Sequence, residues 1–340
     1  MQFILGSSVA PVAPVVTETP FRLPLGGGST DLPSYYEKYG GFIFGVAIDF
    51  YIHVFLKRLR IDRRIQFHYT ACETVNCLHE VHHGIGREAL RMVGIDNSIS
   101  VTFNADSPSG TGLGSSGSYA VGLLNGLYAL EGKTKDPRFL AEKAFEITTN
   151  LGWCDGKQDP YLAAYGGFTV LNIDQNGHVA VSKPDIREYT IDRFLSQTLL
   201  FYTGTKRDGQ SGDILKEQDE QRVLELKHGT KEIGLKILVA FENGDLDEFG
   251  RLMDKHWHIK RQMSGKISSD KFDAIYEMAK QAGALGGKLV GAGGGGYFIF
   301  YCPTSLSKSR VSIALTEAGL QRADFGIDYK GSTTVTIPRM

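Results

Sequence analysis

A run of ten residues, Pro-Ser-Gly-Thr-Gly-Leu-Gly-Ser-Ser-Gly at positions 108–117, constrains this chain more than any other stretch. Its glycines allow backbone turns that other residues reach only under strain, and they let the main chain come close to a ligand. Apolar residues recur at helical spacing directly afterwards, so a helix is expected to begin near Ser115 and Ser116. Unpaired amides at a helix N-terminus bind anions, and a polyphosphate uses several such donors together. The run therefore predicts a phosphate-binding loop. The residues expected to contact the phosphates are Pro108, Gly110, Gly112, Leu113, Gly114, Ser115, Ser116 and Gly117.

Two other interpretations of this run are open. It contains the dinucleotide-fold pattern G-x-G-x-x-G at 112–117, but the same pattern recurs at 291–296 in a different setting, so it is weak evidence. In a dinucleotide fold the glycines directly follow a strand, whereas residues 106–108 intervene here. A purely structural Gly-Ser connection is the other alternative. A Walker-type loop is excluded, because Lys288 is followed by Leu289 where Ser or Thr is required.

Length and charge narrow the classes of protein. At 340 residues the chain exceeds the size at which one hydrophobic core usually stops growing, so two domains are expected. The formal net charge of −1 gives no broad basic surface, which argues against nucleic-acid binding and favours a small-molecule site. No stretch approaches the length of a membrane span, and residues 1–16, though apolar, lack the basic start of a signal peptide. A cytoplasmic protein with four reduced cysteines is therefore expected.

A second glycine turn, at residues 26–31, follows an expected strand at 17–25. Arg22 and Asp31 flank this turn. A carboxylate accepts two hydroxyl hydrogen bonds and an arginine offsets anionic charge, so the pair suits the anchoring of a polar substrate. A surface salt bridge at a hairpin explains the same two residues equally well, and the segment alone does not decide between these interpretations.

One carboxylate further along the chain is a candidate for the chemistry. Asp159 follows Gly156 and precedes an alanine-rich helical turn, so it is expected at a helix start, with Lys157 nearby to keep it ionised. The competing interpretation is an ordinary helix N-cap, a role that Asp often has.

Three histidines and Arg87 lie on an expected helix at 78–93. Histidines three or four residues apart can bind a metal, but the HExxH pattern is missing. A solvated or helix-capping role is therefore favoured for His79, His82, His83 and Arg87.

The rest of the chain mixes strands and helices. Strands are expected at 41–56, 98–104, 198–202 and 297–302, with a hairpin at 167–173 and 179–183 and a final strand or two at 325–337. Helices are expected at 138–149 and over much of the span from 208 to 282. The glycines at 291–296 indicate a place where another backbone or a ligand comes close. A charged run at 185–193 separates an expected first domain, residues 1–190, from a second, residues 191–340.

Three of these segments, in the same order, resemble the motifs of the GHMP kinases, the superfamily of galactokinase, homoserine kinase and mevalonate kinase. Residues 108–117 resemble its P-x-x-x-G-L-G-S-S-A loop and depart from it only at Gly117. Residues 20–31 resemble the first motif of the sugar-kinase branch, and residues 291–296 resemble the third, glycine-rich motif. The segments that look most like kinases of D-glycero-D-manno-heptose 7-phosphate and the related fucokinases are 22–31, 156–167 and 202–204.

This resemblance implies an α+β protein with a ribosomal S5-like N-terminal domain, a ferredoxin-like C-terminal domain and a site between them. It implies an ATP-dependent kinase in which Ser116 reaches Mg²⁺ and the phosphates. Asp159 matches the catalytic carboxylate, and Arg22 matches an arginine near the reacting sugar hydroxyl. Lys157 is expected to offset charge on the transferring group. The residues expected to contact the sugar are Gly28, Ser29, Thr30, Asp31, Gly293 and Gly294.

The resemblance also contains one departure. These kinases commonly carry a Mg²⁺-binding Glu about eleven residues before the catalytic Asp, and this chain has Thr148 there, with Glu146 as the nearest acid. The function implied is phosphorylation of the anomeric hydroxyl of D-glycero-D-manno-heptose 7-phosphate to the 1,7-bisphosphate. A fucokinase- or galactokinase-like enzyme of an unphosphorylated sugar, and an inactive nucleotide-binding protein, remain open. Lys206 and Arg207 are candidates for holding a 7-phosphate. The expected partners are ATP and a small sugar phosphate, with a homodimer left open and without nucleic acid or membrane.

Overall fold

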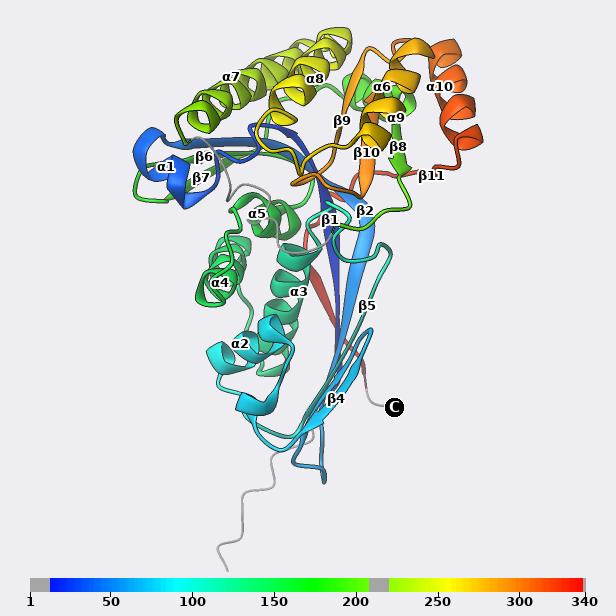
Figure 1. Cartoon of the computed structure of the whole chain (residues 1–340). Coiled ribbons are helices and arrows are strands. Elements are labelled where there is room, and N and C mark those ends of the chain that lie inside the picture. The colour runs from blue at the N-terminus through cyan, green and yellow to red at the C-terminus, as the bar shows by residue number, and fades with distance from the viewer. Residues whose placement is uncertain (1–12, 208–219, 339–340) are drawn as a thin grey trace, which may run out of the picture.

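The computed structural model describes residues 13–207 and 220–338, and it contains two sheets, each packed against helices (Figure 1). The interpretation that the opening residues are no signal peptide falls mostly on residues 1–12, which lie outside the described residues. The first sheet consists of β1 (Val15–Gly26), β2 (Gly41–Arg58), β3 (Ile65–His68), β4 (Cys72–Val75), β5 (Ile99–Ala105), β6 (Phe168–Ile173), β7 (Val179–Ser182) and β12 (Thr333–Thr336). The second sheet consists of β8 (Thr198–Tyr202), β9 (Gly286–Leu289), β10 (Tyr297–Tyr301) and β11 (Gln321–Ala323).

Ten α-helices lie within the described residues. They are α1 (Pro33–Tyr39), α2 (Gly84–Val93), α3 (Ser115–Leu130), α4 (Pro137–Asn150), α5 (Gln158–Tyr165), α6 (Glu188–Gln197), α7 (Glu220–Asn243), α8 (Leu246–Lys260), α9 (Asp270–Gln281) and α10 (Ser305–Glu317). Figure 1 shows α2, α3 and α4 on one face of the first sheet, with α7 and α8 running across its end. None of the described helices combines the length and the apolar character needed to cross a membrane.

Strand β1 leaves part of one edge open, and this edge positions the glycine loop. One edge of β1 pairs with β2. On the other edge β12 pairs only with residues 15–18, so the rest of this edge has no neighbouring strand among the described residues. Further along, the backbone N–H of Arg22 donates to the carbonyl oxygen of Leu113 at 3.1 Å. The loop between β5 and α3 therefore takes the place of a neighbouring strand, because the open edge offers it an unpaired donor.

Helix α3 lies close against the first sheet because two of its residues have no side chain. A Cβ on Gly122 would lie 2.6 Å from Thr19 Oγ1, and one on Gly126 would lie 2.4 Å from Leu56 Cδ1. The hydroxyl of Ser118 donates to the carbonyl oxygen of Pro20 at 2.8 Å. These contacts fix the start of α3 beside the middle of β1.

The second sheet has the strand order β11-β8-β10-β9, and helices separate β8 from β9 and β10 from β11. The element order is thus strand, helices, strand, strand, helix, strand, which is that of a ferredoxin-like domain and confirms this part of the prediction. Helix α7 also reaches the first sheet, where a Cβ on Gly26 would lie 2.6 Å from Gly234 Cα. The two sheets are therefore joined through α7 at the end of β1.

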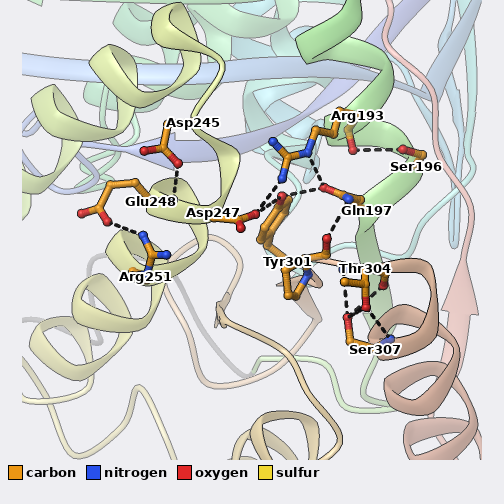
Figure 2. A network of polar contacts seen from close by, with 11 residues as sticks. Arg193, Ser196, Gln197, Asp245, Asp247, Glu248, Arg251, Tyr301, Thr304 and Ser307 are labelled. Atoms are coloured by element: carbon orange, nitrogen blue, oxygen red, sulfur yellow. Dashed lines mark hydrogen bonds and ion pairs between the residues drawn. The ribbon is translucent and has the colours of Figure 1, made fainter.

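A polar network ties the second sheet to helices α6 and α8 (Figure 2). Arg193 donates from Nη2 to Asp247 Oδ1 at 2.7 Å and from Nε to Gln197 Oε1 at 2.9 Å. The hydroxyl of Tyr301 lies 2.6 Å from Gln197 Oε1 and 3.0 Å from Asp247 Oδ1. Burial raises the pKa of Tyr301, so the phenol stays protonated and donates. The network holds β10, the strand that follows the glycine run at 291–296.

Most of the expected elements are present. The strand at 198–202 has the predicted bounds, residues 41–56 form one long strand, and the hairpin of β6 and β7 is confirmed. The expected helix at 78–93 is divided into a short 3₁₀ turn and α2, and His83 Nδ1 accepts from the N–H of Gly86 at 3.1 Å. His83 therefore caps α2, as one of the interpretations predicted. The four cysteines are free thiols.

The expected boundary at 190/191 falls within α6, between the first seven strands and β8. After β11 the chain returns to the first sheet, where β12 pairs antiparallel with β1. The division into residues 1–190 and 191–340 stays a prediction, and the structure adds that the end of the chain packs with its beginning.

Candidate functional site

The two glycine-rich runs, which are far apart in the sequence, contact each other directly. A Cβ on Gly112 would lie 2.4 Å from the carbonyl oxygen of Val290, and one on Gly291 would lie 2.6 Å from Gly112 Cα. A Cβ on Gly296 would lie 1.9 Å from the carbonyl oxygen of Thr111. No side chain fits between the backbones at these points. The glycines at 291–296 are therefore explained by the close approach of another backbone, one of the two reasons predicted for them.

Helix α3 begins at Ser115, as predicted, and its first turn has no side-chain cap. The N-cap residue is Gly114, whose φ of 83° is left-handed and favours glycine. Because no side chain caps this end, the first amides of α3 can bind a ligand. Helix α3 continues into a second helix, α4, and not into a parallel strand, so the dinucleotide-fold interpretation is wrong.

Arg22 links the glycine loop to the candidate catalytic carboxylate. Its guanidinium donates from Nε and Nη2 to Asp159 Oδ1 at 2.8 and 2.6 Å, and from Nη1 to the carbonyl oxygen of Gly112 at 2.5 Å. The side chain of Arg22 is 3% exposed and that of Asp159 is 28% exposed. Arg22 is thus paired with Asp159 and not with Asp31, so the surface salt bridge proposed as an alternative is wrong. The N-cap interpretation of Asp159 is also wrong, because the N-cap of α5 is Lys157.

The starts of α3 and α5 meet at Gly117. A Cβ on this residue would lie 2.6 Å from Asp159 Cβ and 2.8 Å from the backbone nitrogen of Pro160. The position at which the loop departs from P-x-x-x-G-L-G-S-S-A thus lies against Asp159. Glycine there allows the carboxylate to lie directly beside the N-terminus of α3.

Asp31 is fully buried close to Asp159. Its Oδ2 accepts from the N–H of Gln158 at 2.9 Å, and a Cβ on Gly156 would lie 2.0 Å from the same oxygen. Its Oδ1 has no hydrogen-bond partner in the described structure, and neither has Gln158 Oε1. Burial raises the pKa of Asp31 to about 6, and the nearby charge of Asp159 contributes to the increase. Two buried acceptors without donors are therefore carried by residues that contact each other.

A cavity adjoins Asp31, Asp159 and Arg22. One part of its wall carries a further acid, Asp155, whose pKa is raised to about 6 by burial and by the charge of Asp159. The basic residues that α8 and β9 add to the wall are His256, Lys260 and Lys288. Of the described residues, none in 108–117 lines this cavity. The cavity therefore adjoins Asp159 without being formed by the glycine loop.

The sequence reasoning missed all four of these ionisable residues. Asp155 had a local signal, because it stands next to Gly156 and four residues before Asp159. Lys260 and His256 had none, since they lie in the span 208–282, for which the sequence predicted helices but no site.

Lys157 is not where it was expected. Its Nζ lies 2.8 Å from both carboxylate oxygens of Glu142 on α4, and the residue is 4% exposed. The side chain of an N-cap residue leaves the helix in a different direction from the residues of its first turn, and α4 supplies a carboxylate in that direction. The expected pairing of Lys157 with Asp159 is therefore wrong, and Arg22 is the cation beside Asp159.

The expected sugar contacts of Thr30 are also corrected. Its hydroxyl lies 2.7 Å from the carbonyl oxygen of Gly27 and 2.8 Å from that of Phe42, and it accepts from the N–H of Phe42 at 3.0 Å. Thr30 is fully buried and holds the turn against β2, so its hydroxyl has no capacity left for a ligand. Its neighbours Gly28 and Ser29 do line the cavity.

Gly293 and Gly294 do not line the cavity, contrary to expectation. The N–H of Gly294 donates to the carbonyl oxygen of Ile267 at 3.0 Å, and a Cβ on Gly293 would lie 2.8 Å from Ile267 Cγ2. Both glycines pack on this neighbouring segment. The part of the run that reaches the cavity is Gly291 with Ala292.

Comparisons with known proteins found matches in both halves of the chain. A model of the N-terminal domain of GHMP kinases matches residues 73–167, and a model of the C-terminal part of GHMP kinases matches residues 237–319. Together the two matches cover more than half of the chain. They confirm the resemblance and the two-domain α+β fold predicted from the motifs.

Three individual proteins illustrate the similarity. D-glycero-alpha-D-manno-heptose 7-phosphate kinase of Campylobacter jejuni is 28% identical over 331 residues, which cover 93% of this chain and 97% of that protein. L-fucokinase/L-fucose-1-P guanylyltransferase of Bacteroides fragilis is 25% identical over 88% of this chain, which matches only 36% of that protein. The crystal structure of a D-glycero-D-manno-heptose 1-phosphate kinase from Bacteroides thetaiotaomicron superposes with a TM-score of 0.80 at 25% identity, covering 96% of this chain and 100% of that one.

Proposed function

We propose, because this chain belongs to the GHMP kinase family, that it transfers the γ-phosphoryl group of ATP to the anomeric hydroxyl of D-glycero-D-manno-heptose 7-phosphate, giving the 1,7-bisphosphate. As a member of this family with sugar-kinase relatives, the chain is an ATP-dependent phosphotransferase that acts on a sugar hydroxyl. The identity of the sugar is the proposed part, and it rests on the heptose phosphate kinases among the similar proteins.

The observation that carries the proposal is the position of Arg22. Two of its guanidinium nitrogens hold the carboxylate of Asp159, and the third holds the glycine loop at Gly112. A phosphoryl group passing from the loop towards an acceptor in the cavity would travel beside this cation. Phosphoryl transfer depends mostly on positioning and charge neutralisation, and a buried arginine supplies both.

The residues of this chain then have separate tasks. The loop amides between Gly112 and Ser116 would bind the β- and γ-phosphates at the start of α3. Asp159, which contacts this helix start and also lines the cavity, would accept or orient the proton of the anomeric hydroxyl. Asp31, with its unpartnered Oδ1, would accept a hydrogen bond from another sugar hydroxyl.

The fold also supplies oxygen donors for Mg²⁺, which neutralises phosphate charge when bound. Thr148 cannot replace the Glu of related kinases as an acid, and its hydroxyl donates to the carbonyl oxygen of Phe145 at 3.0 Å. Glu146 pairs with Lys143 at 2.6 Å and is exposed, so it is not brought to the loop. Ser116 remains as the residue that would hold the ion together with the nucleotide, which fits because Mg²⁺ commonly uses one or two protein oxygens plus phosphates.

The proposal is tested by incubating the protein with ATP, Mg²⁺ and a panel of acceptors and following the products by ³¹P NMR. The panel contains D-glycero-D-manno-heptose 7-phosphate, the unphosphorylated heptose, fucose and galactose. We expect a new anomeric phosphate with the heptose 7-phosphate. An exclusive product with fucose or galactose would contradict the proposed acceptor, and no product with any sugar would favour a nucleotide-binding protein without activity.

Asp159→Asn separates the chemistry from binding. We expect turnover to fall by a factor of about 10²–10⁴, because the base is lost, whereas the Kd for ADP stays nearly unchanged. Asp185→Asn is the matched control, because Asp185 is exposed and does not line the cavity. Unchanged turnover in Asp159→Asn would remove this carboxylate from the mechanism.

A further inference from the structure

Two lysine amines lie at the cavity without a carboxylate partner. Lys288 is 2% exposed, and its Nζ donates to the carbonyl oxygen of Leu25 at 3.0 Å and lies 3.2 Å from His256 Nδ1. Lys260 is partly exposed as a whole residue, and its Nζ donates to the carbonyl oxygens of Leu289 at 2.7 Å and Gly291 at 2.5 Å. In the described part of the chain neither lysine forms an ion pair with an acid.

Such an arrangement is unfavourable for the protein alone. An ammonium group withdrawn from water without a counterion keeps most of its desolvation cost, because carbonyl oxygens supply no full negative charge. Accordingly, burial lowers the pKa of Lys260 to about 7, with the charges of Arg22 and Arg207 adding to the effect. Burial also lowers the pKa of Lys288 and of His256 well below their ordinary values.

The two lysines still have hydrogen-bonding capacity. Each ammonium group has three N–H donors and makes two polar contacts, so one N–H remains on Lys260 and one on Lys288 when both are protonated. An anion in the cavity would receive these donors and would raise the pKa of both lysines towards the ordinary value.

Another part of the same cavity contains hydrogen-bond acceptors that lack donors within the described structure. Asp31 Oδ1 and Gln158 Oε1 are buried acceptors without donors. The cavity therefore complements a molecule with hydroxyl groups in one part and an anionic group in another. No described residue of the loop at 108–117 lines this cavity, but Lys260 donates to the carbonyl oxygen of Gly291, which contacts Gly112 of the loop. The experiment must therefore separate a phosphate on the sugar from the phosphates of ATP.

We propose that Lys260, Lys288 and His256 form the subsite for a phosphate group carried by the sugar acceptor itself. This inference rests on the proposed function and deepens it: the enzyme selects a sugar phosphate over a free sugar through these three residues. Arg207, one of the two candidates from the sequence, is near this subsite, because its charge also lowers the pKa of Lys260, while its backbone N–H donates to the carbonyl oxygen of Gly110 beside the nucleotide loop. Lys206 and Arg207 therefore stay candidates for additional contacts with the same phosphate.

The test compares two acceptors that differ only in the phosphate, D-glycero-D-manno-heptose 7-phosphate and D-glycero-D-manno-heptose. In Lys260→Met and Lys288→Met we expect kcat/KM for the phosphorylated acceptor to fall by about 10- to 100-fold, the effect of losing a charge-assisted hydrogen bond. For the free heptose we expect kcat/KM to stay within about twofold, and the Kd for ADP to be unchanged. Lys255→Met is the matched control, because Lys255 is exposed on the same helix, α8.

Two results would overturn the subsite. A loss of ADP affinity in the lysine variants would show that these residues hold the nucleotide, and a parallel loss with both acceptors would show a purely structural role. Binding calorimetry without ATP keeps the subsite separate from the proposed function. If the wild-type protein phosphorylates neither acceptor, the proposed function is wrong. Even then, tighter binding of heptose 7-phosphate than of heptose, lost in Lys260→Met, would support the subsite. Equal binding of the two sugars would refute the subsite.

The wild-type protein offers a check that does not depend on folding of a variant. Because Lys260 has a pKa of about 7, it is mostly neutral at pH 8 and should gain a proton when a phosphate dianion binds. Calorimetry in buffers of different ionisation enthalpy should therefore show proton uptake with heptose 7-phosphate and none with heptose. Absence of proton uptake would contradict contact between the phosphate and Lys260.

Discussion

Replacing Asp31 by asparagine should make the folded protein more stable at neutral pH while weakening its interaction with the sugar. The carboxyl group is fully buried, and its pKa of about 6 lies above the ordinary value of 3.8. A pKa difference of about two units corresponds to about 3 kcal/mol of unfolding free energy, from about 1.4 kcal/mol per unit. The ionised carboxylate therefore destabilises the free protein by up to this amount.

The pH dependence gives the sign. Since the pKa of Asp31 is higher in the folded state, the folded protein binds the proton more tightly, and this stabilisation is fully present below about pH 4. The stabilisation from protonated Asp31 is lost as the pH rises to about 6, and it is absent at higher pH. The side chain introduced by Asp31→Asn would keep an oxygen acceptor for the N–H of Gln158, and it carries no charge at any pH. The charge of Asp31 also raises the pKa of Asp155, so removing it lowers that pKa and adds to the difference.

The assay is urea-induced unfolding of wild type, Asp31→Asn and the exposed control Asp185→Asn at several pH values between 4 and 8. At pH 8 we expect Asp31→Asn to exceed wild type by up to about 3 kcal/mol, and the difference to shrink towards zero near pH 4. Its kcat/KM for the acceptor should fall at the same time. A variant that is less stable than wild type at pH 8, or a difference that does not change with pH, would refute the reasoning.

Two other substitutions test contacts on either side of the site. Gly117→Ala restores the residue of the loop pattern that the chain resembles, yet it should lower turnover at least about tenfold and leave the Kd for ADP unchanged. The reason is that the added Cβ would lie 2.6 Å from Asp159 Cβ and displace that side chain. Unchanged kinetics would show that the starts of α3 and α5 can separate freely. Asp247→Ala should lower the unfolding free energy by about 1–3 kcal/mol, because the donors of Arg193 and Tyr301 lose an acceptor (Figure 2). Its kinetics, measured below the unfolding transition, should match those of wild type. A large loss of turnover would contradict a role confined to the second sheet.

The elements that sequence reasoning predicted well have local causes. The start of α3 follows from the change from glycines to apolar residues at helical spacing, and the hairpin of β6 and β7 follows from its turn residues. The placement of Arg22 next to Asp159 came from a resemblance between motifs, since 137 residues separate the two. Neither composition nor periodicity brings them together.

What the sequence did not reveal depends on contacts between distant segments. Thr30 was expected to touch the sugar, but β2 supplies Phe42, whose backbone occupies its hydroxyl. Lys157 was expected beside Asp159, but α4 supplies Glu142. A hydroxyl or an ammonium group has a fixed number of bonds, so its availability to a ligand depends on which partners the fold brings near. That information is absent from the neighbouring sequence.

At two charged positions of the cavity, Asp31 and Lys288, a substitution that makes the protein more stable should also weaken its selection of the ligand. Asp31 and Lys288 are both buried without an opposite charge in contact, and burial shifts the pKa of each towards the neutral form. If they paired with each other, the free protein would gain stability and the cavity would lose both its acceptor and its donor. Their separation keeps each group available for the hydroxyl or phosphate of one acceptor. Uncharged substitutions at these two positions should therefore remove a burial cost along with selectivity, whereas Gly117→Ala, which changes only packing, should lower activity without any such gain in stability.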